Sequence, residues 1–258
     1  MSAMKNWRDP YPAPRVIVHD GFHVVRDDLL GYGSKVRFVD YLIGHDPAHA
    51  NINEWVFGSC PATGYAQISL PVVCKAYGKR AVLFMAKRSD SKLHDYQKLG
   101  AKLGAIYKWV DMGMLTVTQA RARDYVAEDP KTRALLPLGL EHPSVIASIE
   151  IVARSLKIEP AHVWSVGSSG TLTRGLQAAF PNAEVHVVSV GHAMSEREIG
   201  RAIMHRVAYK FDKPAPVREM PPFDSAPTYD AKGWQPMLDY YKTHAKPNGP
   251  VLFWNVGA

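Results

Sequence analysis

The chain has 258 residues, of which 47% are hydrophobic and 21% are charged, so its composition excludes a disordered protein and allows a sizeable core. A net charge of +7 favours an anionic partner such as a phosphorylated cofactor, a nucleic acid or an acidic substrate. The basic residues form no run of five or more, which argues against a dedicated nucleic-acid-binding arm.

The cysteine content and the apolar segments indicate the compartment. Two cysteines, Cys60 and Cys74, are too few for a disulfide framework, and no Cys-x-x-Cys or His/Cys spacing typical of zinc is present. The first 14 residues lack the apolar region of a signal peptide, and no apolar segment is long enough to cross a bilayer. We therefore expect a soluble protein of the reducing cytoplasm, without a metal site.

The first half of the chain predicts alternating strands and helices. Residues 15–26 contain two β-rich runs that flank Asp20-Gly21, which predicts a hairpin. After a glycine-rich turn, an apolar stripe predicts a helix that begins at Lys35. Further strands are expected at residues 54–58, 80–85 and 105–110, and helices at residues 68–76, 92–103 and 116–127. This alternation predicts right-handed βαβ units and a parallel sheet.

The second half continues the pattern after a charged, proline-containing stretch at residues 128–133, which is the best candidate for a domain boundary. We expect loops at residues 135–143 and 214–227, helices at 145–156, 172–180 and 195–209, and strands at 163–166, 184–190 and 251–254. Because ligands of parallel sheets lie beyond the carboxyl ends of the strands, the last residues of the chain are expected to line the site.

A glycine- and serine-rich turn links the strand at residues 163–166 to the next helix. It consists of Gly167, Ser168, Ser169, Gly170 and Thr171. Backbone N–H groups at a helix start, together with hydroxyl donors, bind a phosphate dianion without a basic residue. An ordinary strand-to-helix connection has the same composition, and this stretch alone leaves both explanations open.

Lys35 is placed unusually, because the start of a helix disfavours a cation. Repulsion from the helix dipole, together with burial, would favour the neutral amine, which acts as a nucleophile or forms a Schiff base. An exposed lysine on a surface turn is the more frequent explanation. Other catalytic templates fail: there is no Gly-x-Ser-x-Gly elbow, Walker lysine loop, His-Glu-x-x-His or Gly-x-Gly-x-x-Gly fingerprint.

A reactive lysine and a neutral phosphate site are what a pyridoxal 5′-phosphate (PLP) enzyme needs. Arg26-Asp-Asp-Leu and Gly33-Ser-Lys-Val-Arg37 resemble the Asn-Lys-x-Arg segment of fold-type II (tryptophan synthase β-like) PLP enzymes. The similarity is greatest to the branch of aminocyclopropane-carboxylate (ACC) deaminase and D-cysteine desulfhydrase. Residues 167–171 resemble the phosphate loop of this family, and residues 252–257 resemble its closing strand and Thr-Gly-Gly turn.

The resemblance implies an α/β fold of two parallel-sheet domains with the cofactor between them. The large cofactor-binding domain would comprise residues 1–50 and 131–258, and the small α/β domain residues 51–130. It also implies a homodimer.

The resemblance further implies roles for individual residues. Lys35 would carry PLP, and the turn at residues 167–171 would hold its phosphate. Tyr229 falls where the deaminases have an active-site tyrosine. An aromatic loop residue that only covers the core would explain this tyrosine equally well. Asn255 is a substitute for the usual hydroxyl partner of the pyridine nitrogen. The expected substrate contacts are Thr63, Gly64, Tyr65, Glu141 and His142, and Tyr65, which replaces the family's asparagine, is also a catalytic candidate.

The altered loop at residues 63–66 suits a substrate whose carboxylate is not held in the plane of the ring, as in decarboxylation, or one larger than a free amino acid. The short chain, the basic charge and the Gly-Tyr-Ala-Gln loop resemble PLP enzymes found with bacteriophage thymine-hypermodification genes, thought to decarboxylate amino acids attached to thymine in DNA. A phage-infected bacterium would then be the setting.

Three hypotheses follow. The first is a PLP-dependent decarboxylase of an amino-acid group attached to DNA. The second is a PLP-dependent deaminase or desulfhydrase of a free small amino acid. The third is a phosphate- or nucleic-acid-binding protein without catalytic activity.

Overall fold

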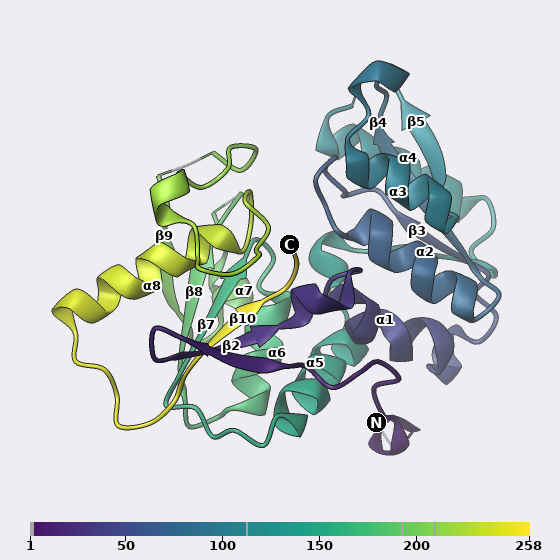
Figure 1. Cartoon of the computed structure of the whole chain (residues 1–258). Coiled ribbons are helices and arrows are strands. Elements are labelled where there is room, and N and C mark those ends of the chain that lie inside the picture. Colours follow the sequence, from purple (N-terminus) through teal and green to yellow (C-terminus); the bar gives the residue numbers. More distant parts are fainter. Residues whose placement is uncertain (1–2, 112, 192, 209) are drawn as a thin grey trace. The chain divides into compact units, whose positions relative to one another are not determined.

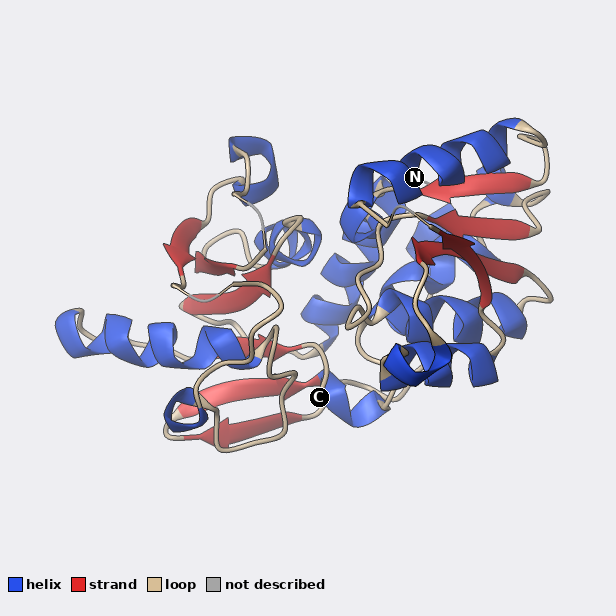
Figure 2. Ribbon diagram, turned by 90° about the horizontal axis from the view of Figure 1, so that it is seen from above, coloured by secondary structure: helices blue, strands red, loops and turns tan. Residues whose placement is uncertain are grey.

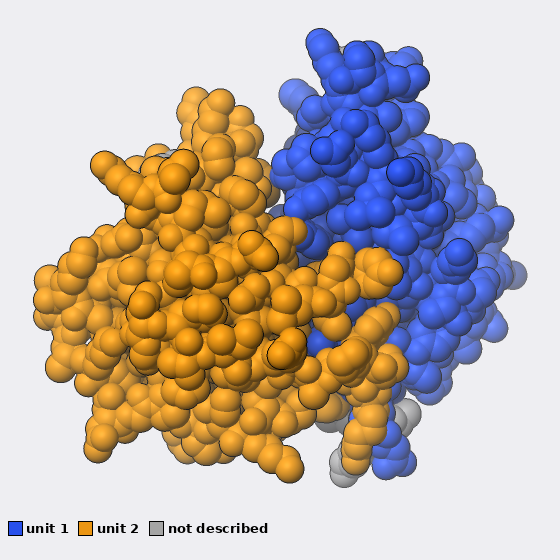
Figure 3. All heavy atoms as spheres, in the orientation of Figure 1, with its two compact units in different colours: residues 1–7, 35–144 blue, residues 8–34, 145–258 orange. Residues whose placement is uncertain are grey.

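The structure is a computed structural model that describes residues 3–111, 113–191, 193–208 and 210–258. The chain divides into two compact units, shown in different colours in Figure 3. Unit 1 comprises Met1–Trp7 and Lys35–Ser144, and unit 2 comprises Arg8–Ser34 and Val145–Ala258.

Unit 1 is built on a four-stranded parallel sheet with the order β5-β4-β3-β6. Its strands are β3 (Glu54–Phe57), β4 (Arg80–Ala86), β5 (Ile106–Val110) and β6 (Arg133–Leu136). Its helices are α1 (Lys35–Gly44), α2 (Ala66–Ala76), α3 (Asp95–Leu103) and α4 (Leu115–Ala127), with 3-10 turns η1 (Ala3–Asn6), η3 (Pro47–His49), η4 (Asp90–Lys92) and η5 (Leu138–Leu140). All four residues of β3 are buried, as expected for a central strand covered on both faces.

Unit 2 is built on a six-stranded sheet with the order β1-β2-β10-β7-β8-β9, in which only β1 and β2 pair antiparallel (Figures 1 and 2). Its strands are β1 (Val16–His19), β2 (Phe22–Arg26), β7 (His162–Gly167), β8 (Glu184–Ser189), β9 (Ile203–Arg206) and β10 (Val251–Asn255). Its helices are α6 (Thr171–Ala179), α7 (Glu196–Ile199) and α8 (Ala231–Thr243), with 3-10 turns η2 (Asp27–Leu30) and η6 (Val217–Glu219); α5 (Pro143–Ser155) spans the boundary between the units.

Side chains of this sheet alternate between its two faces, because successive residues of a strand point in opposite directions. On one face Trp164 and Val166 of β7 join a buried cluster with Trp234 and Met237 of α8. On the other face the hydroxyl of Ser165 lies 3.0 Å from that of Thr173 in α6. The sheet of unit 2 is therefore covered by helices on both faces.

The predicted α/β fold with parallel sheets is confirmed, and the hairpin at residues 15–26 is present. Asp20 and Gly21 both have positive φ, 53° and 79°, as a two-residue hairpin turn of this kind requires. Among the described residues, no helix has both the length and the apolarity needed to span a bilayer.

Two predicted elements are wrong. Instead of one basic helix at residues 195–209, the chain forms the single-turn helix α7 and the strand β9; position 209 lies outside the described residues. Gly200, with φ 59° and ψ −129°, ends α7, and β9 then pairs with β8 as an edge strand. The expected loop at residues 135–143 overlaps the strand β6, which pairs with β3. The helix α8 was not among the predicted elements.

The unit boundaries differ from the expected domains. Residues 1–7, 35–50 and 131–144 were expected in the larger domain, but they belong to unit 1. The reason is that α1 packs against α2, and that β6 completes the sheet of unit 1. The charged stretch at residues 128–133, expected as the boundary, leads from α4 into β6 within this unit.

Candidate cofactor and active site

The loop at residues 167–171 lies at the carboxyl end of β7 and leads directly into α6. Gly170 is the residue that precedes the helix, and its φ of 69° is in the left-handed region that glycine favours. A Cβ atom on Gly170 would overlap the carbonyl of Glu198. Backbone geometry and close packing therefore both require glycine at this position.

The loop suits a phosphate dianion. The hydroxyls of Ser169 and Thr171 are 3.2 Å apart, and both residues are buried. The start of α6 contributes backbone N–H groups and the positive end of the helix dipole. No acidic residue occurs between positions 167 and 173 to repel an anion. The donor set therefore fits the phosphate group that the sequence analysis assigned to this loop.

Tyr229 is hydrogen-bonded to this loop, since both the side chain and the backbone of Ser168 interact with its hydroxyl. Burial, reinforced by the charge of Asp230, raises the pKa of Tyr229 to about 12, although the bonds from Ser168 oppose the shift. The tyrosine is therefore a neutral phenol at pH 7. The structure brings this predicted residue next to the predicted phosphate loop.

Asn255 ends β10 and is fully buried. Its side-chain oxygen accepts a hydrogen bond of 2.7 Å from the hydroxyl of Ser225. Its amide nitrogen donates to the carboxylate of Asp28 at 2.8 Å and to the carbonyl of Asp224 at 2.9 Å. The amide thus holds three segments of unit 2 together, which leaves little capacity for the predicted contact with a pyridine nitrogen.

Asp230 was not identified from the sequence. It is 1% exposed, and its carboxylate accepts a hydrogen bond of 3.2 Å from the backbone N–H of Gly257, in the turn after β10. Its charge also acts on Tyr229. A buried carboxylate is thus placed at the same edge of the sheet as the phosphate loop. The only signal for Asp230 in the sequence is its position next to Tyr229, a predicted site residue.

Lys35 is the first residue of α1, as predicted, and it is half-buried. The N–H of the preceding residue, Ser34, donates to the carbonyl of Val256 at 3.0 Å, which fixes the chain just before Lys35 to the end of β10. The positive charge of Lys35 acts on the thiol of Cys60 by lowering its pKa, but burial outweighs this and raises the pKa to about 12. Lys35 therefore lies near the loop that follows β3.

That loop contains the predicted substrate residues Thr63, Gly64 and Tyr65, all half-buried. It is held by Gln67, whose amide nitrogen donates to the carbonyls of Ala62 at 2.7 Å and Gly64 at 2.9 Å. Gln67 is fully buried and was not identified from the sequence. The hydroxyl of Tyr65 accepts a bond of 3.2 Å from that of Tyr96 in α3.

Glu141 and His142 lie between η5 and α5. The Nδ1 of His142 accepts a bond of 3.2 Å from the backbone N–H of Ser144. Its ring lies edge-on to that of His49, with 5.4 Å between the centroids. Burial and the neighbouring His49 lower the pKa of His142, which keeps the imidazole neutral. The structure therefore places His142 with His49 and Asp46 in one cluster.

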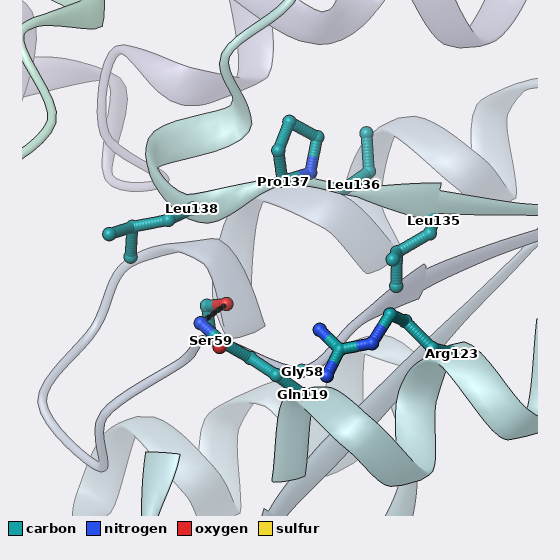
Figure 4. A pocket seen from close by; sticks show the side chains of 8 residues that line it. All are labelled: Gly58, Ser59, Gln119, Arg123, Leu135, Leu136, Pro137 and Leu138. Atoms are coloured by element: carbon teal, nitrogen blue, oxygen red, sulfur yellow. Dashed lines mark hydrogen bonds between the residues drawn. The ribbon is translucent and has the colours of Figure 1, made fainter. Parts of the chain in front are cut away.

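A pocket of 230 Å³ opens at the carboxyl ends of β3 and β6 in unit 1 (Figure 4). Figure 4 shows the side chains of Arg123 and Gln119 from α4 on one side and Leu135 to Leu138 on the other. The amide of Gln119 donates to the hydroxyl of Ser59 at 2.9 Å. A guanidinium beside amide and hydroxyl groups suits an anionic ligand. The sequence analysis did not identify this pocket.

The two parallel sheets, with a glycine-rich loop after β7, define the fold-type II fold of PLP enzymes, as the sequence resemblance implied. No family model matches the chain. A solved structure of an ACC deaminase homologue matches with a TM-score of 0.83 and 14% identity, over 99% of this chain and 93% of that chain. A threonine deaminase from Solanum lycopersicum matches with a TM-score of 0.69 and 14% identity, over 92% and 74% of the two chains.

One curated relative is similar in sequence. It is a glycyl-dTMP PLP-dependent decarboxylase from Pseudomonas phage M6, which is 24% identical over 212 residues, or 72% of this chain and 75% of that protein.

Replacing Gly170 by alanine should disrupt the phosphate loop. We expect Gly170→Ala to lose most of its affinity for PLP, measured by fluorescence titration, because the new methyl group must displace the carbonyl of Glu198. The matched control is Gly31→Ala, which has the same kind of backbone, with φ 71°, but no atom within 4 Å of the new methyl group. Both variants should lose about 1 kcal/mol of stability from the left-handed backbone. Equal PLP affinity in the two variants would contradict the assignment.

Proposed function

We propose that the protein is a PLP-dependent lyase that acts at the Cα atom of an amino-acid-like substrate. The observation that carries this proposal is the loop at residues 167–171, which lies at the carboxyl edge of the unit 2 sheet. The hydroxyls of Ser169 and Thr171 are buried there, and Ser168 is hydrogen-bonded to the neutral phenol of Tyr229. The fold-type II architecture and the phage relative, described as PLP-dependent, support the same cofactor.

The residues that would hold PLP come from three places in the sequence. Lys35 would supply the amine that binds the aldehyde, and the loop at residues 167–171 would hold the phosphate. Asp230 would pair with the pyridine nitrogen, since a buried carboxylate is a typical partner of this group. We favour Asp230 over Asn255, because the amide of Asn255 is occupied by Ser225, Asp28 and Asp224. Bound PLP supplies an electron sink that weakens the bonds at Cα.

The protein's own groups would control the proton and the substrate. Tyr229 keeps its proton at neutral pH, so its hydroxyl can act as a donor beside the phosphate loop. Tyr65 presents a hydroxyl from the loop that follows β3, and Tyr96 holds it in place. Thr63 and Gly64 of the same loop would contact the substrate, as would Glu141 and His142.

We further propose decarboxylation of an amino-acid group attached to thymine as the specific reaction. The similarity to the glycyl-dTMP decarboxylase supports it, as does Tyr65 in place of the family's carboxylate-binding asparagine. The pocket with Arg123 and Gln119 offers donors for the phosphate of a nucleotide, and the net charge of +7 favours a polyanion. The setting would be the cytoplasm of a phage-infected bacterium, and the protein would be a homodimer.

Deamination of a free small amino acid is the second candidate. It is supported by the match to an ACC deaminase homologue over 99% of this chain.

The proposed role of Lys35 is tested by the absorbance of the bound cofactor. We expect wild-type protein reconstituted with PLP to show the absorbance band of lysine-bound cofactor, and Lys35→Ala and Lys35→Arg to lack it. Lys35→Arg keeps the positive charge, so loss of the band in both variants assigns it to the amine itself. A band that persists in Lys35→Ala would contradict the proposal, and a further variant, Lys232→Met, would then test the buried Lys232 of α8.

The role of Asp230 is tested by Asp230→Asn. Removing a charge-assisted hydrogen bond costs about 1.5–3 kcal/mol, so the affinity for PLP should fall by roughly ten- to a hundredfold. The control is Asp224→Asn, which changes an exposed carboxylate nearby in the same unit. Unchanged PLP affinity in Asp230→Asn would exclude Asp230 as the partner of the pyridine nitrogen.

The substrate is tested with the holoenzyme and two sets of compounds: glycine-modified thymidylate, free and in DNA, and a panel of D- and L-amino acids. We expect the modified thymidylate to release carbon dioxide. The nucleoside should then be lighter by about 44 mass units, the mass of one CO₂. Ammonia and a keto acid from free amino acids alone would favour the deaminase. If neither set reacts although the absorbance band is present, the cofactor assignment stands and the proposed substrate classes fail.

A further inference from the structure

A group of histidines lies at the opposite end of β7 from the phosphate loop. His162 is the first residue of β7 and Glu184 the first residue of β8, and the two are paired in the parallel register. His186, two residues along β8, projects from the same face as Glu184. Gly167 is five positions after His162 along β7, a distance of about 17 Å. This group therefore belongs to another site than the one proposed for PLP.

The ligand atoms of these three side chains converge. The Nε2 of His186 lies 3.0 Å from the Oε1 of Glu184, and the Nε2 of His162 lies 3.8 Å from the same oxygen. One ligand atom from each of the three residues lies within 4.8 Å of a ligand atom of the other two. In a tetrahedral zinc site with bonds near 2.0–2.1 Å, ligand atoms are about 3.3 Å apart. Small side-chain movements would therefore bring the three atoms to one ion.

Both histidines already have the outer partners that orient metal ligands. The Nδ1 of His162 lies 2.8 Å from the hydroxyl of Tyr241, and the Nδ1 of His186 lies 3.1 Å from the Nε2 of His205 in β9. Such contacts fix the orientation of the rings. The Nε2 of each ring lies within 4 Å of the Glu184 carboxylate, and the Nε2 of His186 also lies 3.4 Å from the Nδ1 of His162. The ring of His186 is also stacked on Trp164, with 4.1 Å between the centroids and 3° between the planes.

The access of the group suits a metal ion. Access is possible from one side: the side chain of Glu184 is 42% exposed and that of His162 is 16% exposed, whereas His186 is fully buried.

We propose that His162, Glu184 and His186 form a binding site for Zn²⁺. Two imidazoles and one carboxylate are a donor set typical of zinc, and three protein ligands leave the fourth position for water. The site would connect the starts of β7 and β8, while Tyr241 of α8 and His205 of β9 orient the ligands. Its distance from the phosphate loop gives it a stabilising role in unit 2 rather than a role in bond cleavage.

The experiment is a titration of the untagged full-length chain with Zn²⁺, followed by isothermal calorimetry and by metal analysis after dialysis. We expect one Zn²⁺ per chain and, at a hundredfold excess over the Kd, a rise in Tm of about 5 °C. Co²⁺ in place of Zn²⁺ should give the intense visible bands of tetrahedral coordination. Glu184→Gln and His162→Gln should each weaken binding by about a hundredfold, since replacing even an outer partner costs 10–100-fold.

The control is His142→Gln, which changes the other His/Asp group of the described residues, Asp46, His49 and His142 in unit 1. This variant should bind Zn²⁺ like the wild type. Circular dichroism must show that all variants are folded. The proposal is overturned if the wild type retains no zinc after dialysis, in which case the group is only a hydrogen-bonded core. It is equally overturned if His142→Gln, and not Glu184→Gln, loses the ion.

Discussion

The structure of unit 2 depends on the parallel pairing of β7 with β10 on one side and with β8 on the other. This pairing places the end of β7 beside the end of β10, so that the phosphate loop and the turn with Gly257 share one edge of the sheet. It also aligns His162 with Glu184 at the opposite edge. A shift of the register by one residue would turn every side chain to the other face and destroy both arrangements.

The sequence predicted those parts of the fold in which local chemistry and tertiary structure agree. The turn at residues 167–171 is recognisable because its glycine is required by the backbone itself, and the hairpin is recognisable from Asp20-Gly21 for the same reason. The strand β9 was mistaken for a helix because an edge strand, exposed on one side, need not be apolar: Ile203 and Arg206 are both exposed. Pairing with β8 decides its conformation, and pairing is not visible locally.

The candidate site could be predicted only where a residue type or a short local motif indicates a function. Lys35 and the loop at residues 167–171 were proposed from sequence patterns and Tyr229 from the family resemblance, whereas Asp230 and Gln67 were not proposed as site residues. Their importance comes from burial and from partners at a distance, such as Gly257 for Asp230 and Tyr107 for Gln67. The histidine group escaped notice for the same reason. Its members lie 22 and 24 residues apart and meet only because two strands are adjacent, which no zinc-type spacing reveals.

Polar residues near both ends of β7 require an energetic explanation, because the strand is buried from Val163 to Gly167. Burying a polar group without a hydrogen bond costs several kcal/mol, roughly 2–7 by transfer data, so hydrogen-bonded partners must offset the cost. At the carboxyl end Ser169 pairs with Thr171, and at the amino end His186 pairs with Glu184 and His205. An apolar isostere would satisfy packing at either end without these networks. Each edge of the sheet thus combines buried polar groups with hydrogen-bonded partners, and each edge supports a separate proposal.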